Sequence, residues 1–158
     1  MNKFFILLIF VHQLAFSAWE VNNYVDEFGD KTNDKYIIYS TQGTFSNTAT
    51  SNSKVFVDTY FSLDNGVRVN LHEYRLDSSP EKINGIIKIK NNKNEIFTSK
   101  ISPLKKGGFF IENTVDFLKF FMRNEGEFKV VVENGNRSKY NFIIKRENFN
   151  EIVEKELM

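Results

Sequence analysis

Alternation of apolar and polar residues on either side of an Asn-Gly turn is the feature that most constrains the fold of this chain. Residues 55–62 and 67–71 both alternate with a period of two, which places one set of side chains on each face of a β-strand. Asp64-Asn65-Gly66 lies between the two runs. Asn-Gly between alternating runs is the strongest short-range sign of a β-hairpin, because both residues tolerate positive φ. The sequence therefore predicts a hairpin over residues 55–71.

Most of the remaining chain has the pattern of short strands separated by turn residues. Strands are predicted over residues 19–25, 35–39, 83–89, 96–101, 109–111, 128–132 and 140–144. Two more hairpins are predicted around Asn91-Asn92-Lys93-Asn94 and around Asn134-Gly135. The sequence shows no strand–helix–strand alternation, which disfavours parallel sheets and their cofactor clefts.

Two short helices are predicted in the second half of the chain. Thr114 is expected to cap a helix over residues 115–123 that Gly126 ends. Its apolar face is expected to contain Val115, Leu118, Phe121 and Met122. A terminal segment started by Asn148 or Asn150 has apolar residues at helical spacing, namely Phe149, Ile152, Val153 and Leu157. The predicted fold is mainly β, an antiparallel β-sandwich or open barrel with two short helices covering an end.

The start of the chain predicts export. Met1-Asn2-Lys3 is basic, residues 4–11 are an unbroken apolar run, and Ala15-Phe16-Ser17 offers small residues where a signal peptidase cuts. The apolar run spans about 12 Å as a helix, well short of the ~30 Å hydrocarbon core, which favours a cleaved signal over a retained anchor. The predicted organisation is a signal peptide over residues 1–17 and a single β-rich domain over residues 18–158, periplasmic or secreted, with no transmembrane segment after signal removal.

Cysteine content and charge exclude several classes of protein. The chain has no cysteine, so it cannot form disulfides, hold a thiolate metal site or carry a lipid on an N-terminal cysteine. The full sequence has 21 basic and 20 acidic residues, and the loss of Lys3 with the signal makes the two numbers equal. A neutral domain without a basic stripe is not expected to bind nucleic acid.

Candidate catalytic groups are few. His72 is the one histidine of the mature chain, and the alternation of its strand places it on the face opposite Val67, Val69 and Leu71. A triad or a zinc site needs partners that the sequence spacing does not supply. The sequence also contains no Gly-x-Ser-x-Gly, His-Glu-x-x-His or Walker-type glycine loop. Serine, cysteine and zinc hydrolases are therefore not expected.

Acidic residues crowd one turn region near the start of the mature chain. They are Asp26, Glu27, Asp30 and Asp34. Their oxygens could converge on Ca²⁺, but Phe28 occupies what would be the third ligand position of an EF-hand. Turn-forming aspartates that bond their own backbone explain the same composition. The sequence leaves the cation site open, and it identifies no carboxylate pair of the glycosidase kind.

Three further features each have a structural and a functional interpretation. The polar stretch over residues 43–53 could display hydroxyl and amide groups to a glycan or peptide, but a strand with Phe45 in the core and a solvated turn is favoured. The aromatic cluster of Phe117, Phe120 and Phe121 is expected in the core first and in a partner groove second. Asn136-Arg137-Ser138 matches an N-glycosylation acceptor, which matters only in a eukaryote.

Two motifs near the start of the mature chain resemble those of a group of exported bacterial proteins that have no assigned activity. The motifs are Trp19-Glu20-Val21 followed by Val25-Asp26-Glu27-Phe28-Gly29-Asp30-Lys31-Thr32, and Gly43-Thr44-Phe45-Ser46-Asn47-Thr48-Ala49-Thr50. A looser likeness is to exported accessory proteins of type VI secretion, which also begin with a Trp-led strand and close with a helix, a hairpin and an amphipathic helix, as residues 117–157 do here. Those proteins usually carry cysteines, and this chain has none.

The sequence thus predicts an exported, non-enzymatic protein that binds a partner or supports an envelope assembly. No catalytic, cofactor-binding or metal-binding residue is assigned, and the expected partner is a protein or an envelope component. Two alternatives stay open. One is a carboxylate-based hydrolase acting on glycan or peptide, and the other is a carrier of a small apolar ligand.

Overall fold

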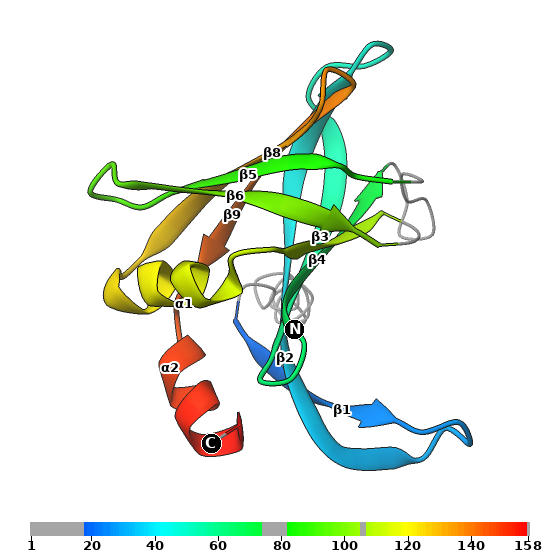
Figure 1. The fold of residues 1–158 in the computed structure, drawn as a ribbon, viewed down its shortest axis with the longest axis vertical. Helices are drawn as coiled ribbons and strands as arrows, with labels where there is room; N and C mark the ends of the chain where they lie inside the picture. Colours follow the sequence, from blue (N-terminus) through cyan, green and yellow to red (C-terminus); the bar gives the residue numbers. More distant parts are fainter. Residues whose placement is uncertain (1–17, 74–81, 105–106, 158) are drawn as a thin grey trace, which may run out of the picture.

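One antiparallel sheet makes up most of the computed structural model, which describes residues 18–73, 82–104 and 107–157 (Figure 1). Its nine strands are β1 (Glu20–Val25), β2 (Lys31–Asn47), β3 (Ser53–Ser62), β4 (Gly66–Glu73), β5 (Gly85–Lys90), β6 (Ile96–Pro103), β7 (Gly108–Ile111), β8 (Glu127–Asn134) and β9 (Ser138–Lys145). They are hydrogen-bonded in the order β1-β2-β3-β4-β7-β6-β5-β8-β9. The predicted signal peptide lies outside the described residues.

An additional pairing between β2 and β9 closes the sheet into an eight-stranded barrel that leaves only β1 outside the ring. The predicted mainly β, antiparallel fold with two short helices is therefore confirmed. The β-sandwich alternative is replaced by a closed barrel, which is near the open-barrel alternative. Closure occurs because the ladder from Thr44 to Asn47 joins the last strand of the sheet to its second strand.

The predicted hairpins are the local building blocks of this barrel. β3 and β4 pair in register from Val55↔Glu73 to Ser62↔Gly66, and Gly66 takes the positive φ of 69° that the turn requires. The hairpins β5–β6 and β8–β9 also form as predicted. Each strand places alternate side chains in the barrel interior and on its outer wall, as a period of two dictates.

The long strand β2 differs from the prediction of two separate short strands. It runs unbroken over 17 residues and changes its neighbour along its length. Its first part pairs with β1 and its last residues pair with β9. Gly43 lies where β2 meets β9, and a Cβ there would lie 2.2 Å from the backbone oxygen of Asn141. Only glycine permits this close approach of two backbones, so Gly43 is a closure point of the barrel.

Apolar side chains from all eight barrel strands fill the interior. The buried set includes Ile37, Tyr39, Phe45, Val55, Val57, Phe61, Val67, Val69, Leu71, Ile87, Ile89, Ile101, Phe109, Ile111, Phe128, Val130, Val132, Tyr140, Phe142 and Ile144. One end of the barrel is covered by the helices and by Trp19, whose ring centroid lies 4.8 Å from that of Phe149 and 5.3 Å from that of Tyr39. Burial of this continuous core stabilises the domain without disulfides.

The first helix, α1 (Thr114–Arg123), buries a face that shares Phe121 and the partly buried Leu118 with the predicted one but not Val115 and Met122. Phe117, Phe120 and Phe121 are buried, which confirms their placement in the core, whereas Val115 is 63% exposed and Met122 is 44% exposed. The larger aromatic rings determine the orientation, because Phe117 and Phe121 stack on each other and the three rings make tilted or edge-to-face contacts with Phe97 and Phe128 of the sheet.

The predicted cap of this helix is also wrong. Asn113 is the N-cap residue and makes no side-chain capping bond. The Thr114 hydroxyl donates to the Ile111 oxygen at 2.7 Å, so it ties the helix back to β7 instead.

The chain ends in α2 (Phe149–Ile152), which continues as the π-helical turn η1 (Val153–Leu157). Asn148 precedes it, as one of the two predicted starts, and Phe149 and Val153 are buried. The Asn148 side chain accepts from the Trp19 backbone N–H and donates to the Trp19 oxygen, both at 3.2 Å. These two bonds hold the start of β1 against the end of the domain. No helix in the described part of the chain has the length and apolarity needed to cross a membrane.

Candidate functional site

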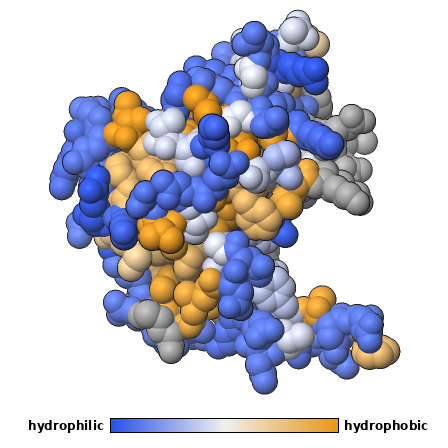
Figure 2. Space-filling model, in the orientation of Figure 1, coloured by the Kyte–Doolittle hydropathy of each residue, from blue (hydrophilic) through white to orange (hydrophobic). Residues whose placement is uncertain are grey.

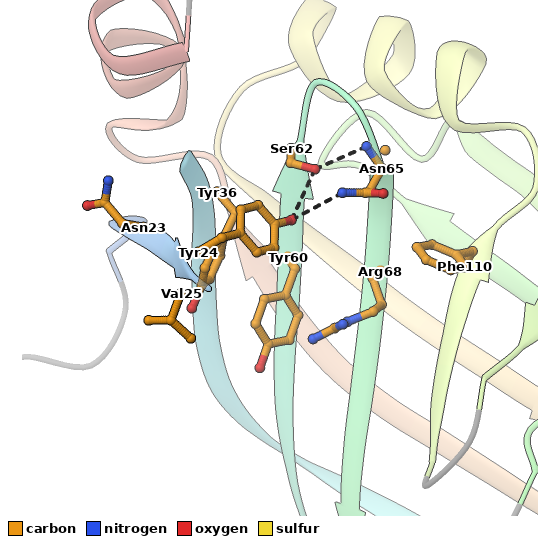
Figure 3. Close-up of a pocket in the computed structure, with 10 residues that line it drawn as sticks. Asn23, Tyr24, Val25, Tyr36, Tyr60, Ser62, Asn65, Arg68 and Phe110 are labelled. Atoms are coloured by element: carbon orange, nitrogen blue, oxygen red, sulfur yellow. Dashed lines mark hydrogen bonds between the residues drawn. The ribbon is translucent and has the colours of Figure 1, made fainter. Parts of the chain in front are cut away.

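A hollow of about 510 Å³ lies between the barrel wall and the arm, which we define as residues 22–36 of β1, β2 and their connecting turn. Figure 2 shows the arm projecting beside the barrel with the molecule hollowed between them. The residues that line this groove are Asn23, Tyr24, Val25, Tyr36, Tyr60, Ser62, Asn65, Gly66, Arg68 and Phe110 (Figure 3). We call it the tyrosine groove.

Strand alternation explains why these side chains face outward. Tyr36, Tyr60, Arg68 and Phe110 occupy the wall positions of β2, β3, β4 and β7, while their chain neighbours fill the core. Arg68 pairs in register with Tyr60 on one side and with Phe110 on the other. Tyr24 of the arm lies 4.9 Å from Tyr36, and Tyr36 lies 5.7 Å from Tyr60, measured between ring centroids. The result is one row of side chains that crosses five strands.

Among the described residues that line the groove, Arg68 is the single charged one. Its guanidinium carbon lies 4.3 Å from the centroid of the Tyr60 ring, in the geometry of a cation–π contact. Its Nε is buried and makes no hydrogen bond to any residue that the structure describes. Burial raises the pKa of Tyr60 and the charge of Asp58 adds to this effect, while the charge of Arg68 and its hydrogen bond to the Tyr60 hydroxyl lower the pKa. Tyr60 is therefore a neutral phenol at neutral pH.

Hydrogen bonds fix the end of the groove that lies at the β3–β4 turn. The Tyr24 hydroxyl donates to Ser62 Oγ at 3.4 Å and accepts from Asn65 Nδ2 at 3.4 Å. The backbone N–H of Asn65 donates to the same Ser62 oxygen at 3.1 Å. The predicted Asn-Gly turn thus supplies a side chain that holds the arm against the β3–β4 hairpin, as Figure 3 shows. These contacts order the groove without a ligand.

His72 lies on the outer wall, as predicted from strand alternation. Its Nε2 is 3.3 Å from Asp58 Oδ2, and Asp58 Oδ1 accepts from the Ser40 hydroxyl at 2.6 Å. In a catalytic triad the histidine bonds the nucleophilic serine. Here the carboxylate lies between serine and histidine, so His72 does not activate Ser40.

In the acidic turn of the arm, Asp26 bonds the backbone of its own turn, which is the structural interpretation given above. Asp26 Oδ1 accepts from the backbone N–H groups of Phe28 and Asp30, both at 2.9 Å. Within the described ranges no three histidine or acidic side chains converge in a way that could hold a metal ion. Phe28 stands at the tip and is 83% exposed.

The polar stretch over residues 43–53 also follows its structural interpretation. Phe45 is buried in the core, and residues 48–52 form the turn that leads into β3. Asn136 and Arg137 of the glycosylation motif lie in the tight β8–β9 turn, as expected. A second hollow, about 560 Å³, lies where β2 and β9 diverge, and its most exposed apolar lining residue is Ile143. No charged group among the described residues of that hollow is buried without a partner.

Sequence reasoning did not single out the residues of the tyrosine groove. A signal was present, because Tyr36, Tyr60 and Phe110 occupy positions of alternating strands that usually carry small or polar side chains. Large aromatic residues at outer-wall positions of neighbouring strands indicate a surface that binds another molecule or another segment of the chain. Which strands are neighbours, however, depends on the barrel topology.

Comparison with protein-family models, with curated proteins and with solved structures gives no match to this chain. The function is therefore inferred from the geometry and chemistry of the groove.

Proposed function

We propose that the protein is an exported, non-enzymatic binding protein and that it holds a protein partner in the tyrosine groove. The composition of the groove is the observation that carries this proposal. Within the part of the chain that the structure describes, its lining includes three tyrosines, one phenylalanine and one arginine, with no lysine, aspartate or glutamate. The cores of protein–protein interfaces are enriched in aromatic residues and arginine and depleted in those three, and most binding energy resides in such residues.

The two alternatives have less support. A hydrolase needs an acid and a base beside its substrate, and the groove-lining residues for which the structure gives positions include no aspartate, glutamate or histidine. Asp58 on the same wall is bound by Ser40 and His72. A carrier of an apolar ligand needs an unfilled lumen, whereas the interior of this barrel holds its own aromatic and aliphatic side chains.

Site-specific photo-crosslinking tests the proposal. A benzoylphenylalanine introduced at Tyr36 is expected to form an adduct with a discrete protein in cells that naturally produce this chain. The same group at Lys129, an exposed residue of β8 on the opposite side of the barrel, is the matched control and should form none. The adduct should also disappear when Tyr60→Ala is added. Equal adducts at both positions, or hydrolysis of envelope polymers by the purified protein, would contradict the proposal.

Export is tested on the same native material. Signal cleavage after Ser17 predicts a mature chain that begins at Ala18, which keeps the buried Trp19 in the folded domain. Mass spectrometry of the intact native protein measures this terminus. A chain that retains Met1, or that starts beyond Trp19, would contradict the predicted signal peptide.

A further inference from the structure

We propose that the tyrosine groove recognises an extended, acidic segment of its protein partner and that Arg68 binds a carboxylate of that segment. The inference rests on the proposed function, because it names the chemistry that the groove would accept. It identifies Arg68 as the residue that selects charge and the tyrosine row as the surface along which the segment lies.

The state of Arg68 is the first argument. A buried N–H group without an acceptor is unfavourable, and an incoming acceptor removes that penalty. Nε of Arg68 is such a group. Contact with the Tyr60 ring and a hydrogen bond to the Tyr60 hydroxyl hold the guanidinium in place, so the donors that these contacts leave over keep a fixed geometry. A planar guanidinium binds a carboxylate through two parallel hydrogen bonds, which makes a carboxylate the best-matched acceptor.

The charges around the groove are the second argument. No acidic residue among residues 18–73, 82–104 and 107–157 lines it, so none of these neutralises Arg68 within the groove. Asp58 lies on the same face of β3, but its two oxygens bind Ser40 and His72. The positive charge is therefore available to a partner, and a negative group there gains an attraction that solvent screens only in part.

The length of the row is the third argument. It crosses β1, β2, β3, β4 and β7, with Tyr24 and Phe110 at its two ends. Four interstrand steps of about 4.8 Å make the row about 19 Å long, which is the length of about six residues of extended chain. Aromatic faces contact such a segment with little sequence preference. Arg68 then supplies the specificity, near the Phe110 end.

Peptide selection on the purified mature protein, with a random phage-displayed library as the probe, tests the inference. Selected peptides are expected to share an aspartate or glutamate beside apolar or aromatic residues. Arg68→Gln should weaken their binding at least about tenfold, as expected for loss of a charge-assisted bidentate pair. Arg68→Lys should recover only part of it, because it restores the charge without the planar fork. Lys129→Gln, which removes a cation from the opposite side of the barrel, should change nothing.

Two variants separate failure of this inference from failure of the proposed function. If Tyr36→Ala abolishes binding while Arg68→Gln leaves it intact, the groove is the binding site but the acidic anchor is wrong. If Tyr36→Ala leaves binding intact, the groove is not the site and both proposals fall. A wild-type protein that selects no peptide also overturns the inference. Circular dichroism of each variant shows that the barrel is folded before binding is compared.

A second copy of this chain is the competing occupant. The tip of the arm presents the same chemistry, because the exposed Phe28 is flanked by Asp26, Glu27 and Asp30. Sedimentation equilibrium of the wild type should show a monomer. Self-association that both Phe28→Ser and Arg68→Gln abolish would make the arm of a second copy the occupant and would overturn the assignment to a different protein.

Discussion

Truncation of the single tryptophan should lower the stability of the domain, because Trp19 packs at the covered end of the barrel. Trp19 is 4% exposed and lies against Tyr39, Phe121 and Phe149, with ring centroids 5.3, 6.1 and 4.8 Å away. Its indole N–H donates to the Lys145 oxygen at 2.8 Å. The Trp19→Ala variant removes both the apolar contacts and the donor, so its effect is the sum of two terms.

The magnitude follows from these contacts. A buried tryptophan removes about 200 Å² from water, and about 25 cal/mol per Å² gives an upper value of about 5 kcal/mol. Measured losses for such truncations are about 3–5 kcal/mol, and the unsatisfied carbonyl adds about 1 kcal/mol. We expect Trp19→Ala to lower the free energy of unfolding by about 5 kcal/mol. Trp19→Phe keeps a ring but loses the donor, so it should cost about 1–2 kcal/mol.

Urea unfolding followed by far-ultraviolet circular dichroism measures these changes, because the substitution removes the only tryptophan as a fluorescent probe. Phe28→Ala is the matched control, since Phe28 is 83% exposed and its removal should change stability by less than about 0.5 kcal/mol. The reasoning is refuted if Trp19→Ala costs less than about 1 kcal/mol. It is also refuted if the two alanine variants are equally destabilised.

Two further predictions concern barrel closure and alkaline pH. Gly43→Ala places a Cβ 2.2 Å from the Asn141 oxygen and should cost about 3 kcal/mol in urea unfolding, whereas Gly135→Ala, with open space but a φ of 55°, should cost only about 1 kcal/mol. Equal costs would contradict the role of Gly43. Burial is the largest cause that raises the pKa of Tyr39, Tyr60 and Tyr140. The unfolded chain then ionises first, so stability should be full below about pH 10 and fall as the pH rises further. Absorbance titration should show these tyrosines ionising late, and simultaneous ionisation of all tyrosines near pH 10 in the folded protein would contradict it.

Local features of the fold could be predicted because their causes are local. The β3–β4 hairpin follows from alternation and from Gly66, whose positive φ the turn needs. The outward position of His72 follows from the same alternation. The Asp26 turn follows from a side chain that bonds the backbone two and four residues ahead.

The face of α1 could not be predicted from spacing alone. Both Val115 with Met122 and Phe117 with Phe121 lie at helical intervals, so two overlapping apolar faces compete. The sheet resolves the competition, because the rings of Phe97 and Phe128 make edge-to-face and tilted contacts with Phe117 and Phe121. Similarly, nothing local shows that residues 35–39 and 43–46 belong to one strand that changes its neighbour.

The sequence by itself determined the strand content, the hairpin turns and which side chains of each strand share a face. Those properties depend on a residue and its near neighbours, through φ preferences and the period of two. Only the tertiary structure decided that the sheet closes, because closure depends on the fit of Gly43 against Asn141, far apart in the chain. It also created the tyrosine groove. Tyr24, Tyr60 and Arg68 come from three strands, and they meet only because the barrel and its arm place those strands side by side.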